Sequence, residues 1–453
     1  MTALAVLTGE PAWVNCPITR TLDVDRAGAA HCAAFGNDRP LKVFLYSHDT
    51  FGLGHLRRNL AIAQRLLDCA GRFSVHLLTG SPVIDQWRIP RGLHVQPLPP
   101  VVKIGAERYR SREKGQCFGL VKGYREALIL KLVLHHQPDV FLVDHAPAGM
   151  NGELLATLAL IRREMPQTRV MLGLRDILDS PATVREIWRD QDIYTLLEQV
   201  YDDILVYGSR ALFDVVEGYG ISDRVAARVR YCGHVVSATA ARPSAGAAAG
   251  ADRPCWDSAR AAGRDVVLVT AGGGDDGFFM MDAYLHALRQ MSEGRRHSVI
   301  VTGPLMSREE NAALRAAAAG RADVELVDYT TDLAPSLRAA DLVVAMAGYN
   351  TCAEIIAARK RAILVPRAAP RAEQLMRARL LTRLRAVRTI EPGPQLIPAL
   401  AAMVPAALAA EAPSQSVWAA LDLNGAERVT EYLLSRAEPG SDAWEAARLE
   451  SVA

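Results

Sequence analysis

Short apolar runs alternate with amphipathic stretches along most of the chain from residue 41 onward. Residues 41–46 read Leu-Lys-Val-Phe-Leu-Tyr, and the stretch 55–68 then places Leu56, Leu60 and Leu67 at helical spacing. The same rhythm repeats further on, with apolar runs at 73–78, 93–98, 138–144, 169–173 and 204–207 and helical stretches at 117–136, 151–164 and 181–198. Strands that alternate with helices predict a parallel sheet covered by helices on both faces.

Residues 237–264 interrupt this rhythm with a segment rich in Ala, Gly, Pro and Ser, the composition of a linker. The alternation then restarts, with apolar runs at 265–270, 297–302, 324–327, 342–345 and 362–365. We therefore predict an α/β protein with two Rossmann-like domains, at 41–236 and 265–414, and a ligand site in the cleft between them. Residues 1–40 show no clear period and predict a poorly ordered N-terminal extension, while an amphipathic helical stretch at 415–435 precedes the tail.

Composition narrows the class of protein. The 453 residues are 50% hydrophobic and carry a formal net charge of +2, which gives no electrostatic case for nucleic acid as a partner. Seven cysteines include no CxxC pair, so we expect reduced thiols, neither a disulfide framework nor a zinc site. No apolar run reaches the ~20 residues that span a bilayer, and no basic leader begins the chain. We expect a cytoplasmic protein, and a peripheral membrane contact stays open.

The first chemical motif, Ser-His-Asp-Thr-Phe-Gly-Leu-Gly-His-Leu-Arg-Arg, occupies residues 47–58, between the first strand and the first helix. Gly52 and Gly54 permit a tight turn and close approach of a substrate. His55 then stands at the helix start, where the helix dipole keeps the imidazole neutral and able to accept a proton from a hydroxyl. Arg57 and Arg58 are suited to anionic groups. The alternative is a plain turn with a capping histidine.

Asp144 ends the apolar run 138–144. This places it at the carboxyl edge of the first sheet, where open α/β sheets bind ligands. Its carboxylate is positioned either to orient His55 or to touch an acceptor, and the alternative is an ordinary turn aspartate.

The second motif is the glycine-rich loop 270–277 after the first strand of the second half. Gly272 and Gly273 expose backbone N–H groups that suit a phosphate or the domain interface. No Lys-Ser/Thr pair follows, so the loop is not a P-loop. The adjacent Asp275 and Asp276 are better explained by helix capping than by a metal site.

The third motif, residues 347–354, also follows an apolar run and opens a helix. Gly348 makes the turn, Asn350 or Thr351 is placed to cap, and the free N–H groups of the first turn favour a diphosphate. Glu354 lies about one helical turn further on, where its carboxylate suits the two hydroxyls of a ribose. The alternative is a capping box between Thr351 and Glu354.

The fourth motif, residues 365–374, is again a strand, a loop and a helix start. Arg371 is suited to phosphate and Gln374 to the hydroxyls of a sugar. The alternative is an ordinary solvated surface.

Taken in this order, the motifs resemble those of the GT-B family 28 glycosyltransferases, which include the UDP-N-acetylglucosamine transferase of the bacterial peptidoglycan precursor. Ser47 to Asn59 is also similar to the SHDxxGxGHxRRN-like start of bacterial predicted glycosyltransferases. The resemblance covers about residues 41–435. It implies the GT-B fold, in which the two parallel sheets face a central cleft, and a final helix within 415–453 that crosses back to the N-terminal domain.

The resemblance also implies roles. Glu354 matches the family glutamate that holds the donor ribose, Gln374 matches the glutamine at the donor sugar, and His55 matches the acceptor-side histidine. Members of the family are inverting and need no metal at the reacting centre. The chain departs from the family at Tyr349, where a second glycine is common, and its loop 103–116 shows no interpretable match.

We therefore expect an inverting, metal-independent, hexosyltransferase-type enzyme without a cofactor. Its donor is a nucleotide sugar, UDP-linked on the resemblance alone, and its acceptor is a glycan, a lipid or a small molecule. Two alternatives stay open: a nucleotide-sugar hydrolase of the same fold, which the GxGHxxR pattern also resembles, and a non-catalytic protein that binds sugar nucleotides.

Overall fold

In a computed structural model, the structure describes residues 39–49, 54–105, 108–112, 115–236, 256–291, 296–330 and 333–437. Three predictions therefore fall outside the described residues: the extension up to residue 38, the turn glycine Gly52, and the linker from 237 to 255.

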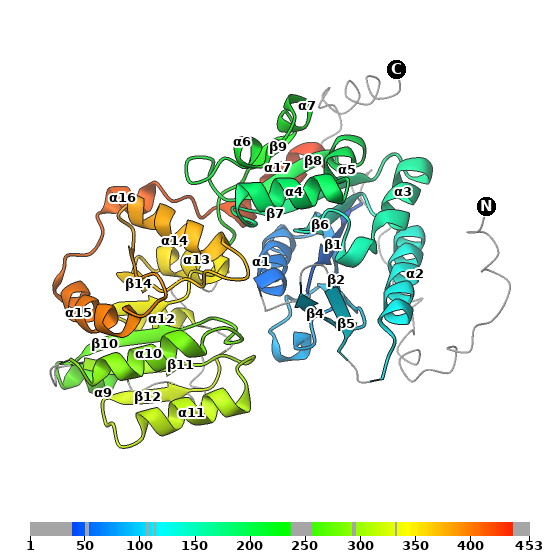
Figure 1. The fold of residues 1–453 in the computed structure, drawn as a ribbon. Helices are drawn as coiled ribbons and strands as arrows, with labels where there is room; N and C mark the ends of the chain where they lie inside the picture. Colours follow the sequence, from blue (N-terminus) through cyan, green and yellow to red (C-terminus); the bar gives the residue numbers. More distant parts are fainter. Residues whose placement is uncertain are drawn as a thin grey trace. The chain divides into compact units, whose positions relative to one another are not determined.

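The N-terminal lobe is built on a seven-stranded sheet in which every neighbouring pair of strands is parallel (Figure 1). The order across it is β3 (His94–Pro97), β2 (Phe73–Thr79), β1 (Leu41–Ser47), β6 (Val140–Asp144), β7 (Arg169–Arg175), β8 (Asp203–Tyr207) and β9 (Val229–Tyr231). The helices are α1 (Gly54–Leu67), α2 (Phe118–His136), α3 (Leu155–Glu164), α4 (Pro181–Asp190), α5 (Ile193–Gln199), α6 (Val215–Tyr219) and α7 (Asp223–Ala226). An antiparallel hairpin, β4 (Val101–Gly105) and β5 (Arg108–Ser111), stands apart from this sheet.

The C-terminal lobe repeats the design with a six-stranded parallel sheet. Its order is β12 (Val324–Val327), β11 (Arg296–Val301), β10 (Asp265–Thr270), β13 (Leu342–Ala345), β14 (Ala362–Leu364) and β15 (Arg388–Thr389). The helices are α9 (Trp256–Ala261), α10 (Phe278–Leu288), α11 (Arg308–Ala318), α12 (Ala334–Ala339), α13 (Tyr349–Ala357), α14 (Glu373–Arg383) and α15 (Leu396–Ala409), followed by α16 (Gln415–Ala419) and α17 (Gly425–Ala437).

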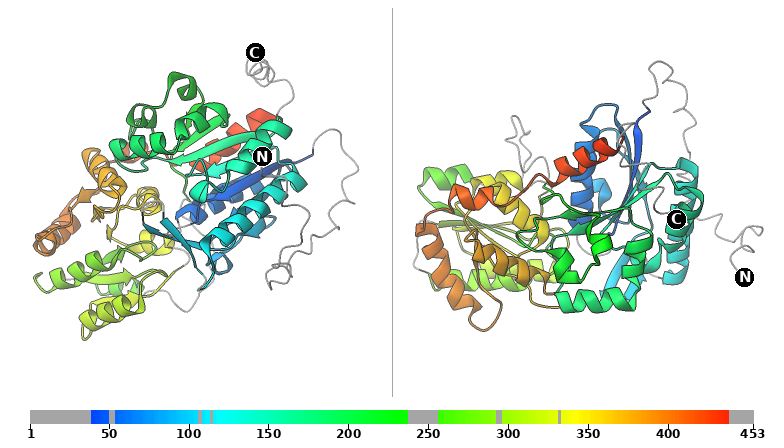
Figure 2. Two further views of the ribbon diagram at one scale, coloured as in Figure 1. Left: turned by 45° about the vertical axis from the view of Figure 1, so that its right-hand side comes forward. Right: turned by 90° about the horizontal axis from the view of Figure 1, so that it is seen from above.

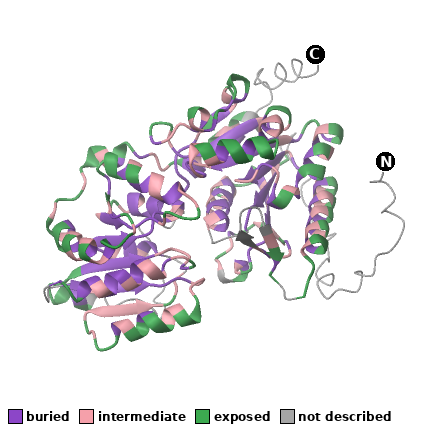
Figure 3. Ribbon diagram, viewed as in Figure 1, coloured by how far each residue is buried: buried purple, intermediate pink, exposed green. Residues whose placement is uncertain are grey.

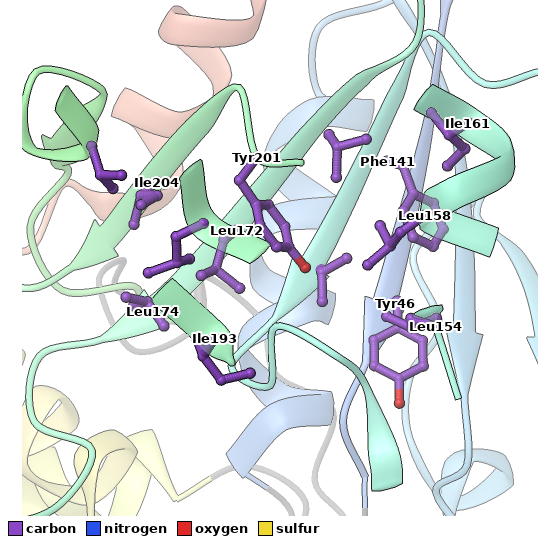
Figure 4. Close-up of a cluster of buried hydrophobic side chains, with 14 of the residues drawn as sticks. Tyr46, Phe141, Leu154, Leu158, Ile161, Leu172, Leu174, Ile193, Tyr201 and Ile204 are labelled. Carbon is purple, nitrogen blue, oxygen red and sulfur yellow. The ribbon is translucent and has the colours of Figure 1, made fainter. Parts of the chain in front are cut away.

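Both sheets are apolar on both faces, which explains the nearly continuous apolar runs in the sequence. In β1, Val43 and Leu45 pack with α1, while Phe44 and Tyr46 enter the cluster that α3 and α4 cover. Figure 3 shows the central strands of both sheets as buried. Figure 4 shows Phe141 beside Leu158 and Tyr46 beside Leu154 in the second of these clusters.

The last helix, α17, belongs to the core of the N-terminal lobe. Val429 and Leu433 are buried in the same cluster as Leu56 of α1, and Figure 2 shows the two helices side by side. The phenol of Tyr432 adds a hydrogen bond to the Asp203 carboxylate. These contacts attach the end of the chain to its first domain.

In each sheet there is one point at which the direction of strand addition reverses, the topological switch point. The chain winds outward in one direction from β1 and in the other from β6, and likewise from β10 and β13. Ligands of open α/β sheets bind at the carboxyl ends of the strands at such a point. The loops after these four strands contain the first, second and third sequence motifs and Asp144.

The local differences from the sequence prediction have backbone causes. The helix predicted over 181–198 is two helices, because Asp192 adopts a left-handed conformation with φ of 52°. The helix predicted from 151 starts at Leu155, because Asn151 and Gly152 have positive φ in the preceding turn, Met150–Gly152.

The substitution Gly274→Ala tests how tightly the glycine-rich loop is packed. Gly274 has φ of 94°, and an added Cβ would lie 2.3 Å from the Thr302 carbonyl oxygen. Gly320→Ala is the matched control, since Gly320 has φ of 79° with nothing within 4 Å. Both lose the freedom of glycine, but the clash should cost Gly274→Ala about 1–3 kcal/mol more. Chemical unfolding measures the two free energies, and equal losses would contradict the close packing of this loop.

Candidate active site

His55, Asp144 and Arg58 form a buried cluster at the switch point of the first sheet. His55 Nδ1 lies 2.6 Å from Asp144 Oδ2, while Arg58 donates to Asp144 Oδ1 from Nε at 3.0 Å and from Nη2 at 2.5 Å. His55 and Arg58 come from α1, and Asp144 ends β6, the strand next to β1. The structure thus brings together the histidine and the aspartate that the sequence proposed as a pair.

Side chains of the first motif also stabilise the start of α1. Asn59 Nδ2 donates to the His55 carbonyl oxygen at 2.9 Å and to Ser47 Oγ at 3.2 Å. Ser47 ends β1, so this side chain ties the first turn of the helix to the strand that leads into the loop. Asn59 on one side and the Asp144–Arg58 pair on the other therefore hold His55 in place.

The electrostatics of this cluster keep His55 neutral. Burial lowers the pKa of the imidazole to about 4, although the neighbouring carboxylate of Asp144 opposes the shift. Burial alone would raise the pKa of Asp144, but Arg58 and His55 hold it at about 2. An ionised carboxylate 2.6 Å away assigns the ring proton to Nδ1. The Nε2 lone pair of His55 is then the one available to accept a proton.

Two further histidines gather around His55. The His145 ring centroid lies 5.0 Å from that of His55, and the His48 centroid lies 5.6 Å away. His145 has a positive φ of 70°, which is unusual for a residue other than glycine and typical of functional turns. Burial lowers its pKa well below the ordinary value. Sequence reasoning missed both rings, although each directly adjoins a strand end.

On the C-terminal side, α13 begins without a side-chain cap. Gly348 is its N-cap residue with φ of −62° and ψ of 148°, and no side chain bonds to the helix start. The capping box that was the alternative for Thr351 and Glu354 is therefore not formed. Gly272 adopts φ of 71°, and a Cβ there would lie 3.2 Å from Thr351 Oγ1, so the glycine loop packs closely on the helix start.

One cavity, which we call the donor cavity, joins these elements. Most of the predicted residues line it: Gly54, His55, Arg57, Arg58, Gly272, Gly273, Gly348, Asn350, Thr351 and Gln374. Asp144 lies behind His55 as its hydrogen-bond partner. The carboxylate of Glu354 forms an ion pair with Arg57 of α1, so the residue predicted to hold the ribose is occupied by a guanidinium.

Arg371 differs from its predicted place. It lines a second cavity, beside His145, instead of the donor cavity. The donor cavity has another arginine, Arg175, at the end of β7. Burial lowers the pKa of this guanidinium to about 10, and its Nε is buried without a hydrogen-bond partner. No ion pair to Arg175 occurs among the described residues, so it is suited to an anion. In the sequence, Arg175 could have been recognised as a charged residue directly after an apolar run.

The two lobes are fastened beside the donor cavity. Arg377 of α14 donates to both carboxylate oxygens of Asp176, at 2.9 and 2.7 Å, and to the Ala347 carbonyl oxygen at 2.9 Å. Tyr349 of α13 is buried in the core of the N-terminal lobe, where its phenol donates to the Tyr207 carbonyl oxygen at 2.9 Å. Its ring also lies 5.5 Å from the guanidinium carbon of Arg58.

Two features are absent from the described residues. They contain no cluster of three or more His, Cys, Asp or Glu side chains arranged to hold a metal ion. Within the same part of the chain, none of the helices has the length and apolar character that crossing a membrane requires.

Known proteins resemble this chain in one domain and in the fold. Residues 266–412 match the family model described as the glycosyltransferase family 28 C-terminal domain. Among curated proteins, no sequence matches the chain significantly.

Three solved structures share a similar fold over most of this chain. The glycotransferase of kitacinnamycin is 17% identical with a TM-score of 0.55, over 88% of this chain and 100% of that chain. MurG from Acinetobacter baumannii is 14% identical with a TM-score of 0.53, over 87% and 99%. A putative UDP-N-acetylglucosamine 2-epimerase from Listeria monocytogenes is 14% identical with a TM-score of 0.57, over 88% and 98%. At such identities the likeness concerns the fold alone, and the predicted GT-B class is confirmed.

The pKa of His55 can be measured by NMR titration of labelled imidazoles. We expect a midpoint near pH 4, because burial disfavours the charged ring, whereas urea-unfolded protein should titrate near 6.5. Between these values the unfolded state binds the extra proton, so the stability from neutral His55 is lost as the pH falls from 6.5 to 4. Circular dichroism follows folding in the same samples. A midpoint near 6.5 in folded protein would contradict the buried neutral base.

Proposed function

We propose that this chain, a family 28-like glycosyltransferase by the match of its C-terminal domain, transfers a sugar with inversion from a nucleoside diphosphate donor to an acceptor hydroxyl. The donor is UDP-linked on the family resemblance. The observation that carries the proposal is the uncapped start of α13, which lines the same cavity as His55.

The diphosphate of the donor lies against the first turn of α13. The N–H groups there and the helix dipole favour negative charge, and Gly272 and Gly273 let the phosphates approach the backbone. Arg175 lines the cavity without an ion pair among the described residues and supplies positive charge to the diphosphate. The ribose hydroxyls replace Arg57 at the Glu354 carboxylate, and Gln374 contacts the sugar.

The transfer is a single displacement. Nε2 of His55 accepts the proton of the acceptor hydroxyl, while Asp144 holds the ring and stabilises the imidazolium as it forms. The hydroxyl oxygen forms its bond to the anomeric carbon from the face opposite the departing diphosphate. Arg175 and the amides of α13 stabilise the charge of that leaving group, so the proposed step runs without a metal.

Loss of the base is the direct test of this mechanism. In His55→Gln we expect kcat to fall by about 10²–10⁴, the usual contribution of a general base, while the Kd for UDP is unchanged. Turnover is followed by mass spectrometry after a thermal-shift screen has identified the nucleotide sugar, and EDTA should leave it unchanged. Undiminished transfer in His55→Gln would refute the role. Release of free sugar at the full rate without any acceptor would assign hydrolysis instead.

Arg175→Met and Arg371→Met form a matched pair, because the two arginines line different cavities. We expect Arg175→Met to raise the Kd for UDP by about 10–100-fold, the effect of a lost charge-assisted hydrogen bond, and Arg371→Met to leave it unchanged. Isothermal titration calorimetry measures both. If Arg371→Met weakened UDP binding and Arg175→Met did not, Arg371 would be the phosphate-binding residue, as the sequence alone suggested.

A further inference from the structure

A second cavity, which we call the acceptor cavity, lies in the N-terminal lobe on the other side of the histidines. Its volume is about 320 Å³, near the lower end of small-molecule pockets. His48 and His145 line it, and their rings adjoin that of His55, which lines the donor cavity. A molecule in the acceptor cavity therefore contacts rings that adjoin the proposed base.

The walls of this cavity are mainly apolar. Leu178, Val184, Trp188 and Ile193 contribute from the loop after β7, from α4 and from α5. Two further members are large apolar side chains that stay exposed: Leu155 of α3 at 49% and Ile187 of α4 at 37%. Five large apolar side chains of the described residues are exposed in this way, and two of them line this one cavity. The apolar area calls for a ligand that covers it.

The polar groups of the cavity lie together and carry little net charge. Asp179 and Arg371 are its charged members, one of each sign. Asp179 Oδ1 already accepts hydrogen bonds from the backbone N–H groups of Ser180 at 2.8 Å and Ala372 at 2.9 Å. His145 lines the cavity, and its Nδ1 is buried without a hydrogen-bond partner.

The loop that borders the cavity is rigid. Glu153, fully buried, receives two hydrogen bonds of 2.6 Å from Arg125 and one of 2.6 Å from the Tyr46 phenol, which itself accepts from the Met150 N–H at 3.0 Å. Gly149, Asn151 and Gly152 of this loop line the cavity. The site is thus formed before a ligand arrives, which limits the size of its occupant.

We propose that the acceptor cavity selects a compact alcohol or phenol, with an apolar ring body against Leu155 and Ile187 and its hydroxyl beside the histidines. This rests on the proposed transfer and narrows its acceptor. The hydroxyl oxygen bonds to the anomeric carbon, the bond from that carbon to the diphosphate oxygen breaks, and the proton passes to His55. A polyprenyl chain would need a longer apolar channel than this cavity provides.

The test uses 2-naphthol as the probe and measures its Kd by fluorescence, with UDP binding measured separately by calorimetry. We expect Leu155→Asn and Ile187→Asn each to weaken 2-naphthol binding about tenfold or more, because each places an amide on the apolar wall. UDP affinity should not change in either variant. Leu134→Asn is the matched control, since Leu134 of α2 is 47% exposed and does not line the cavity.

The outcomes separate this inference from the proposed function. Absence of 2-naphthol binding, or binding that the three variants affect equally, would overturn the assignment of the cavity while UDP binding stood. Preferential transfer to methyl glucoside or to polyprenyl phosphate in vesicles would also overturn it. Absence of UDP binding would refute the proposed function, whatever 2-naphthol did.

Discussion

The ion pair between Asp176 and Arg377 is the constraint on which the geometry of the site depends. Both side chains are about 1% exposed, and the guanidinium also holds the Ala347 carbonyl oxygen, immediately before the turn at Gly348. Arg175 precedes Asp176, so the same contact fixes the end of β7 against the start of α13. A buried pair of this kind adds little net stability, but removing one partner leaves an uncompensated charge. Its effect here is to set the distance between the proposed base and the proposed diphosphate site.

Around that contact, each lobe contributes one part of the proposed site. The switch point of the first sheet provides His55, held by Asp144 and kept neutral by burial. The switch point of the second sheet provides a helix start without a cap. Tyr349, which stands where the resembled family often has glycine, anchors that helix start in the N-terminal core. The departure from the family pattern thus serves to attach one lobe to the other.

Much of this architecture could be predicted because its causes are local. Sheets that are apolar on both faces leave runs such as those of β1 and β10 in the sequence, and glycines mark the loops that follow them. The predicted GT-B fold is confirmed, and residues 266–412 match the family 28 C-terminal domain. The break of the helix at Asp192 was not predictable from spacing, since its cause is one left-handed residue inside an amphipathic pattern.

The parts of the site that were missed depend on contacts between distant residues. Arg175 is distinguished by its burial and by an Nε without a hydrogen-bond partner, neither of which a sequence shows. The pair of Arg57 with Glu354 joins two motifs that were interpreted separately. The place of Arg371 in the acceptor cavity follows from the path of the loop before α14. Such features need the fold before they can be recognised.

A crystal structure of the protein with UDP tests the central claim most directly. The account predicts the diphosphate against the N–H groups at Gly348 to Thr351, with the Arg175 guanidinium within hydrogen-bond distance and the ribose at Glu354. A donor cavity that stayed empty at saturating UDP, or a diphosphate bound away from α13, would contradict it.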